Sequence, residues 1–194
     1  MLKSKDEAFK YFKKIKAAAE NEMGVKLKAF RTDCGGEFNS IEFEDYCNEL
    51  GIKRYTTAPY SPQQNGVVER RNQTVMEMAR SLLKSMSVPA TFWGEAVKTA
   101  VHILNRAPTR SLHGKTPYEA WYKRKPSVHY FRVFGCVAHV KKVGPSVTKL
   151  SDRSTLMVFL GYEEGSKAYR VYGPKVNKLH VTRNVVFQEE KQWD

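Results

Sequence analysis

The start of the chain has the residue spacing of an amphipathic helix followed by a strand. Within residues 4–22, Phe9, Phe12 and Ile15 recur at helical intervals, which predicts a helix with one apolar face. Residues 25–33 then alternate apolar and polar side chains, and this alternation predicts a strand that runs into a tight turn. The residues expected on the inward face of that strand are Val25, Leu27 and Ala29.

Two short and two long elements complete this mixed α/β region. Residues 41–51 predict a short helix closed by its final glycine, and residues 52–59 predict a short strand. One long helix is expected to start near residue 65, and a second to run from residue 89 to about residue 106. The apolar stripes expected to face the core are Val68, Val75, Ala79, Leu82 and Met86 in the first of these helices, and Phe92, Ala96, Ala100 and Ile103 in the second.

The pattern changes after residue 107. Residues 108–129 hold prolines and basic side chains, which predicts a connector with at most a short turn of helix. From residue 130 onward, short strands at hairpin spacing predict a small antiparallel barrel or sandwich. We therefore expect a mixed α/β domain in residues 1–107, a connector in residues 108–129 and an all-β module in residues 130–190.

Composition and charge indicate a globular protein with a polyanionic partner. Hydrophobic residues make up 41% of the chain, which is enough for a packed core. The chain carries 33 Lys and Arg against 20 Asp and Glu, a formal net charge of +13, and nucleic acid is the commonest partner of so basic a protein. Residues 120–194 hold 14 of the basic and six of the acidic groups, so the β-module lies in the more basic part.

Neither a membrane segment nor a disulfide or zinc framework is indicated by the sequence. No apolar run approaches the roughly 18 residues of a spanning helix, and residues 1–20 lack the apolar centre of a signal peptide. We therefore expect a soluble, intracellular protein without a membrane partner. Cys34, Cys47 and Cys136 form no C-x-x-C pair, and no histidine spacing combines with them into a zinc cluster.

Two acidic residues are candidates for metal chemistry. Asp33 lies at the end of the predicted strand, and Glu69 lies in the first turn of the first long helix. Two carboxylates that converge suit Mg²⁺, and two-metal phosphoryl transfer needs such a pair with a third, shared ligand. Each residue also has an ordinary structural interpretation, since aspartate favours tight turns and glutamate in a first helical turn complements the helix dipole. The two residues alone leave both interpretations open.

Longer stretches of the sequence resemble a known family. RTDCGGEF at 31–38 and APYSPQQNGVVERRNQT at 58–74 resemble the second and third acidic motifs of integrases from copia-type long-terminal-repeat retrotransposons. The segment 93–121 and the strands from FRVFGCVAHV onward resemble the regions that follow in that family. The resemblance implies an α/β and then all-β fold, with a partial ribonuclease H-like integrase core, its first strands missing, followed by a small SH3-like β-barrel. It also maps Asp33 and Glu69 onto the second and third members of a catalytic Asp, Asp, Glu triad that binds Mg²⁺ or Mn²⁺.

The first member of that triad has no counterpart among the matching stretches. In the family it belongs to the first strand of the sheet, which precedes everything that matches here. Asp6 lies at the start of the predicted amphipathic helix, a position that joins the third strand to the first helix in the family, so we do not expect it to be the shared ligand. Cys34 also departs from the family, which often has asparagine beside the acidic residue.

Amide and basic side chains are the candidate DNA contacts. Amides in the loop before the first long helix are expected to reach bases or phosphates, and basic groups on that helix, in the connector and in the β-module suit the DNA backbone. Since Arg70 and Arg71 are adjacent, at most one of them is expected to face the DNA. Solvated surface charge is the competing explanation for these groups. The residues expected to contact DNA are Gln63, Gln64, Asn65, Arg70, Arg71, Lys123, Arg124, Lys125, Lys167, Arg170 and Lys178.

The resemblance implies a function for the parent protein. That function is DNA integration by metal-dependent phosphodiester cleavage and strand transfer, performed on element ends and target DNA by a homo-oligomer in the nucleus. Because the shared ligand is missing, we expect this chain alone to be catalytically incomplete. Two alternatives remain open, namely a non-catalytic nucleic-acid-binding module and an inert relic of a decayed element.

Overall fold

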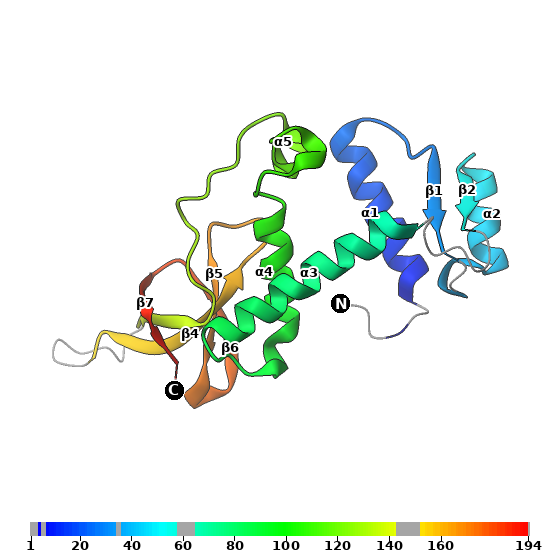
Figure 1. Cartoon of the computed structure of the whole chain (residues 1–194). Coiled ribbons are helices and arrows are strands. Elements are labelled where there is room, and N and C mark those ends of the chain that lie inside the picture. The colour runs from blue at the N-terminus through cyan, green and yellow to red at the C-terminus, as the bar shows by residue number, and fades with distance from the viewer. Residues whose placement is uncertain (1–3, 5–6, 34–35, 58–64, 143–151, 194) are drawn as a thin grey trace. The chain divides into compact units, whose positions relative to one another are not determined.

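The structure is a computed structural model, and it describes residue 4 and residues 7–33, 36–57, 65–142 and 152–193. The chain forms two compact units, Met1–Arg71 and Asn72–Asp194, and each is described by itself. Figure 1 labels the α-helices and most of the strands of both units. The division between the units falls inside a helix, so it does not coincide with the predicted connector at 108–129.

The first unit contains a short βαβ arrangement preceded by a helix, drawn in blue and cyan in Figure 1. Its elements are α1 (Glu7–Met23), β1 (Ala29–Thr32), the 3₁₀ turn η1 (Gly36–Phe38), α2 (Ile41–Glu49) and β2 (Lys53–Thr56). β1 and β2 pair in parallel, because the helical crossover between them returns the chain in the same direction. α2 begins after Ser40, whose side-chain oxygen accepts a hydrogen bond from the backbone N–H of Phe43 at 3.2 Å. Both helices predicted in this region are confirmed.

Aromatic rings from both helices and β1 form the core of this unit. Phe43 of α2 is fully buried, and Phe12 of α1 packs against it with ring centroids 5.2 Å apart. Phe30 of β1 lies 4.6 Å from Phe12. Within β1 the predicted phase is therefore wrong: Phe30 faces inward and Ala29 is exposed, because a phenylalanine ring removes far more apolar area from water. Leu27, which precedes β1, packs against this core as predicted. Val25, also predicted to face inward, precedes the strand and is 64% exposed.

The helices around the unit boundary carry the predicted apolar stripes. α3 (Gly66–Ser85) spans the boundary, and α4 (Trp93–Leu104) follows the 3₁₀ turn η3 (Ala90–Phe92). Ala79 on α3 and Ala96 on α4 are buried, as their stripes predict, but Val68 is 50% exposed. Across the described ranges, no helix combines the length and the apolar character that crossing a membrane requires.

The predicted connector contains a short, well-capped helix. The 3₁₀ turn η4 (Arg110–Leu112) is followed by α5 (Pro117–Tyr122). The hydroxyl oxygen of Thr116 accepts a hydrogen bond from the backbone N–H of Glu119, and the Glu119 carboxylate accepts one from the backbone N–H of Thr116. This reciprocal pair satisfies two donors that the start of a helix otherwise leaves unbonded.

Five antiparallel strands form the sheet of the second unit. The strands are β3 (Cys136–Lys141), β4 (Ser154–Tyr162), β5 (Tyr169–Gly173), β6 (Lys178–Thr182) and β7 (Val185–Gln192), with the 3₁₀ turn η5 (Pro174–Val176) between β5 and β6. Their order is β6-β5-β4-β3-β7, so β6 and β7 are the outer strands in the part of the chain that the structure describes. Pairing of β3 with β4, β4 with β5 and β5 with β6 confirms the short-strand pattern predicted from the sequence.

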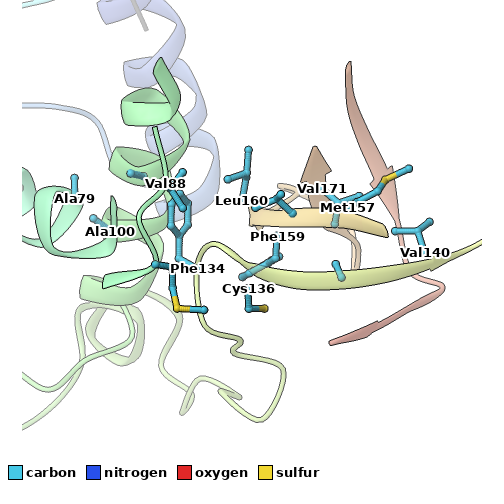
Figure 2. Packing of buried hydrophobic residues seen from close by; sticks show 14 residues of the cluster. Ala79, Val88, Ala100, Phe134, Cys136, Val140, Met157, Phe159, Leu160 and Val171 are labelled. Atoms are coloured by element: carbon cyan, nitrogen blue, oxygen red, sulfur yellow. The ribbon is translucent and has the colours of Figure 1, made fainter. Parts of the chain in front are cut away.

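Helices and strands of the second unit share one hydrophobic core, shown in Figure 2. Phe159 and Leu160 of β4 are fully buried and belong to the same cluster as Ala79 of α3 and Ala100 of α4. At the contact between α4 and β4, the Thr99 hydroxyl donates a hydrogen bond to the carbonyl oxygen of Leu160 at 3.3 Å. The β-module therefore does not form its core by itself, because α3 and α4 complete it.

A histidine lies in an aromatic cage between α4 and the sheet. The ring of His102 stacks on Tyr162 with centroids 4.4 Å apart, and its Nε2 atom lies 2.9 Å from the hydroxyl oxygen of Tyr130. Burial lowers the pKa of His102 to about 4, and the positive charge of Arg106 acts in the same direction. The imidazole is therefore neutral near pH 7.

We expect this cage to reduce the stability of the protein in acid. The unfolded chain binds a proton at His102 below about pH 6.5, whereas the folded chain does so only near pH 4. The free energy of unfolding should therefore not change above about pH 6.5. It should fall between about pH 6.5 and pH 4, by up to about 3 kcal/mol. Urea unfolding followed by tryptophan fluorescence at about pH 7.5 and about pH 4.5 measures the loss. His102→Phe should reduce it and His129→Phe, at an exposed position, should not; equal losses in all three proteins would contradict the assignment.

Candidate active site and nucleic-acid surface

Asp33 directly follows β1, at the end of the parallel strand pair. Phe30 anchors this strand in the aromatic core, and the backbone N–H of Thr57 donates to the carbonyl oxygen of Thr32 at 3.1 Å. These contacts hold the backbone immediately before Asp33. The residue itself is exposed, so the strand presents a carboxylate at its end.

Glu69 lies in the first turn of α3 and is also exposed. A negative charge is stabilised there, because the unbonded N–H groups at the start of a helix give it a partial positive charge. Asp33 and Glu69 belong to the same compact unit, Met1–Arg71. The expectation that their side chains converge on one metal site stays a prediction.

The described residues add no third metal ligand to this pair. Among the described residues, no group of three or more His, Cys, Asp or Glu side chains is placed to hold a metal ion. Gln63 and Gln64, predicted to contact DNA beside the acidic pair, lie outside the described residues, as do Asp6 and Cys34. Asp33 and Glu69 therefore remain the candidate metal ligands.

The polar residues at the start of α3 are placed as the sequence suggests. Asn65 lies half-buried immediately before the helix, and Arg70 and Arg71 are exposed in its first turns. Successive residues of a helix point about 100° apart, so the two guanidinium groups leave the helix in different directions. That only one of them faces bound DNA stays a prediction.

The basic triplet after α5 makes local contacts. The ammonium group of Lys123 donates to the carbonyl oxygen of Ala120 at 2.9 Å, and Arg124 donates to the hydroxyl of Tyr118 at 3.3 Å. Lys123 also ends the helix in a left-handed conformation, with a φ of 58°. All three side chains, including Lys125, are exposed, so contact with DNA stays a prediction.

Arg170, predicted to contact DNA, forms ion pairs with two carboxylates, and its DNA contact stays a prediction. Its Nε and Nη2 atoms donate to the two carboxylate oxygens of Glu95 on α4 at 2.8 and 3.0 Å, and its Nη1 atom donates to Glu163 at 2.7 Å. These three hydrogen bonds use three of the five N–H donors of the guanidinium group. We call these three residues the Arg170 clamp. Lys167 and Lys178, predicted alongside Arg170, are exposed.

Glu95 and Arg170 are both ionised although they are largely buried. Burial by itself would raise the pKa of Glu95, but the hydrogen bonds and charge of Arg170 outweigh it, and the pKa lies below its usual value. Hydrogen bonding to Glu95 is also the main cause of the raised pKa of Arg170. Sequence reasoning missed the clamp because its members lie on separate elements. The available signal was the position of Glu95 three residues after Phe92, beside the inward stripe of α4.

The two described cysteines are packing residues. Cys47 and Cys136 are free thiols, and both are fully buried. Burial raises the pKa of each, that of Cys136 to about 12. A thiol is nucleophilic only as the thiolate, so neither residue is a candidate catalytic nucleophile.

The chain is similar to proteins of mobile genetic elements. Residues 135–194 match the family model of the retroviral polymerase SH3-like domain, and residues 1–85 match that of the TnsB C-terminal domain. Over 193 residues, 98% of its length, it is 43% identical to the retrovirus-related Pol polyprotein from transposon TNT 1-94 of Nicotiana tabacum. Over 188 residues, 97% of its length, it is 32% identical to the Pol polyprotein from transposon RE2 of Arabidopsis thaliana. It spans 14% and 13% of the length of these two relatives.

Solved structures also show a partial likeness. One is a chain of the simian T-cell lymphotropic virus intasome in complex with PP2A regulatory subunit B56 gamma, with a TM-score of 0.47 and 18% identity over 94% of this chain and 64% of that chain. Another is the HTLV-2 integrase catalytic core domain in complex with magnesium, with a TM-score of 0.43 and 24% identity over 59% of this chain and 69% of that chain.

The matched modules define a segment of a retroelement polyprotein. The chain belongs to the family of retrovirus-related Pol polyproteins from transposons. The copia-type resemblance is confirmed at this level. The predicted order of fold classes is confirmed as well, since an α/β region with a parallel strand pair precedes a five-stranded antiparallel sheet, and residues 135–194 match the SH3-like family model.

Proposed function

We propose that the chain carries part of the active site of a DNA-integrating enzyme, with Asp33 and Glu69 as two of its metal ligands. The observation that best supports this is the 43% identity over 193 residues to the TNT 1-94 polyprotein. The placement of the two carboxylates is compatible with it, because both are exposed, one at a strand end and one in a first helical turn. A substrate as large as duplex DNA needs such exposure.

The chemistry of the two residues fits Mg²⁺ or Mn²⁺. Carboxylate oxygens are the ligands that these hard cations prefer, and when bound the ions supply activation of a nucleophile and charge stabilisation in phosphodiester cleavage. The contribution of this chain is to hold one carboxylate at the end of β1 and the other on α3. A pair of ions also needs a bridging ligand, which no described group of three candidate side chains supplies. We therefore infer that the chain alone does not complete the reaction.

Metal titration and strand-transfer assays test this proposal. Calorimetric titration of the chain with Mn²⁺ is expected to show weak binding that Glu69→Gln removes. Glu77→Gln, at another exposed position of α3, should leave the binding unchanged. Incubation with Mn²⁺ and labelled duplex DNA is expected to give no strand-transfer product. A product that disappears in Glu69→Gln would overturn the inferred incompleteness, and Mn²⁺ binding that ignores Glu69 would overturn the ligand assignment.

Nucleic-acid binding without catalysis is the second candidate function. It is favoured by the charge of residues 120–194, which carry 14 basic and six acidic groups. Binding through phosphate contacts releases counterions, so affinity should fall steeply as the salt concentration rises. A nuclear location and self-association belong to the integrase proposal and are not needed for this second function.

A further inference from the structure

Two segments of the first unit flank the candidate metal ligand Asp33. β1 ends at Thr32, directly before it, and η1 begins at Gly36, three residues after it. The parallel pairing of β1 with β2 fixes the first of these segments. A ligand of a metal site has to be held to within about 0.5 Å of its productive position, so the second segment has to be fixed as well. The contacts of η1 therefore bear on the geometry of Asp33.

The η1 turn is held weakly by its own hydrogen bonding. The backbone N–H of Asn39 donates to the carbonyl oxygen of Gly36 at 3.3 Å, which is longer than the usual range for such bonds. A short 3₁₀ turn also has poorer hydrogen-bond geometry than an α-helix. The ring of Phe38 packs in the aromatic core, with its centroid 5.3 Å from that of Phe30. This packing fixes the side chain of Phe38, but it bonds none of the carbonyl groups of η1.

Arg54 of β2 binds the main chain of this turn. Its Nη2 atom donates a hydrogen bond to the carbonyl oxygen of Phe38 at 2.8 Å. The bond is assisted by the charge of the guanidinium group, and such bonds are shorter and stronger than those between neutral groups. The same Nη2 atom lies 3.5 Å from the side-chain oxygen of Asn39, and Nη1 lies 3.8 Å from the carboxylate of Glu44 on α2. One guanidinium group on β2 thus contacts both η1 and α2.

Packing keeps the Arg54 side chain in this position. The side chain is 22% exposed, and its guanidinium carbon lies 5.3 Å from the centre of the Phe43 ring. In the strand register Arg54 lies opposite Phe30, which is three residues before Asp33. Arg54 therefore connects the two segments that flank Asp33, β1 through the strand pairing and η1 through the carbonyl group of Phe38.

We propose that Arg54 is a positioning residue for Asp33 in the candidate metal site. The inference rests on the proposed function and deepens it, because it names the side chain that sets the place of one proposed ligand. Arg54 does not contact the metal ion. It fixes the carbonyl oxygen of Phe38, and the anchored η1 turn then limits where the carboxylate of Asp33 can lie. Without the guanidinium group, that carbonyl oxygen loses its charged donor and η1 loses this anchor to β2.

Broadening of backbone amide NMR signals by Mn²⁺ tests the proposal on the full chain. The paramagnetic ion broadens the signals of nearby amides, so Thr32 reports on the Asp33 side of the site and Arg70 on the Glu69 side. Both signals should broaden in the wild type. Arg54→Met keeps an unbranched apolar stem but removes every donor. In this variant the ratio of Thr32 broadening to Arg70 broadening should fall about threefold, and the calorimetric affinity for Mn²⁺ should fall about 10-fold.

Two control variants separate positioning from stability. Glu44→Gln removes the ion pair of Arg54 with a 60% exposed carboxylate and keeps the bond to Phe38, so the Mn²⁺ affinity should change less than about twofold. Ile52→Val leaves a small cavity in the same core and should lower the melting temperature, as Arg54→Met does. It should not change the broadening ratio. If Ile52→Val lowered that ratio as much as Arg54→Met, Arg54 would act through stability alone and the proposal would be overturned.

The same NMR signals distinguish failure of the positioning role from failure of the proposed function. Wild-type broadening that misses Thr32 or Arg70 would overturn the proposed pair of ligands, and the role of Arg54 with it. Broadening of both signals with the same ratio in the wild type and in Arg54→Met would keep the metal site and overturn the positioning role. A ratio that falls in Arg54→Met and not in the two controls would support both.

Discussion

Gly161→Ala is expected to lower the free energy of unfolding of the Asn72–Asp194 unit by about 3 kcal/mol or more. A Cβ atom at this position would lie 2.5 Å from the hydroxyl oxygen of Thr99, and the φ of Gly161 is +136°, which residues with a side chain rarely adopt. Overpacking a core and straining the backbone each cost about 1–3 kcal/mol. The hydroxyl cannot withdraw without losing its hydrogen bond to Leu160.

A second glycine and a double variant separate the steric clash with Thr99 from the backbone strain at Gly161. Gly165 also has a positive φ, +72°, but a Cβ there would meet no atom within 4 Å, so Gly165→Ala should show backbone strain alone, about 1 kcal/mol. Thr99→Ala removes the atom that clashes. In urea unfolding, Gly161→Ala should therefore cost less in a Thr99→Ala background than in the wild type. The same cost in both backgrounds would refute the close approach of α4 to β4.

Arg170→Met is expected to destabilise the same unit by about 2–3 kcal/mol. The substitution leaves the carboxylate of Glu95, which is 14% exposed, without its strongest partner. Breaking a fully buried pair costs about 3–5 kcal/mol. The loss should be smaller here, because Arg170 is 21% exposed and Lys98 remains 3.4 Å from Glu95.

A double-mutant cycle identifies the source of that loss. Glu95→Met combined with Arg170→Met removes both charges and leaves no buried carboxylate unpaired, so it should recover much of the stability. Lys167→Met, at an exposed position before β5, should change stability by less than about 0.5 kcal/mol. If the double variant lost as much free energy of unfolding as the two single variants together, Arg170 and Glu95 would not be energetically coupled. Because Arg170→Met is expected to be less stable, its measured DNA affinity must be corrected for the fraction of unfolded protein.

Long periodic helices were the part of the fold that the sequence predicted best. The stripes through Ala79 and Ala96 repeat over several turns, so one ambiguous position does not change the interpretation. β1 has only four residues, so the local sequence does not decide which face of the strand is buried. The choice was decided by Phe30, whose ring reaches the rings of α1 and α2, and such tertiary contacts are not encoded in a local pattern.

The candidate site shows the same limit at longer range. Asp33 and Glu69 were found because each lies within a motif that resembles a family. The ion pair of Arg170 with Glu95 was not predicted, because the two residues lie 75 positions apart in the chain. The net charge of the chain predicts a polyanionic partner. Tertiary contacts decide which cations, such as Arg170, are paired within the protein.

Glu69 and Ala79 lie on one uninterrupted helix, and this makes α3 sensitive to insertions and deletions. Adding or removing a single codon between them would turn the carboxylate by about 100° relative to the stripe that enters the core. Every side chain named in the site would still be present, yet Glu69 would point elsewhere. A copy of the sequence with such an insertion or deletion would thus lose the geometry of the proposed metal site although all its acidic residues were still present. Point substitutions on the exposed face of α3 would accumulate with far less consequence.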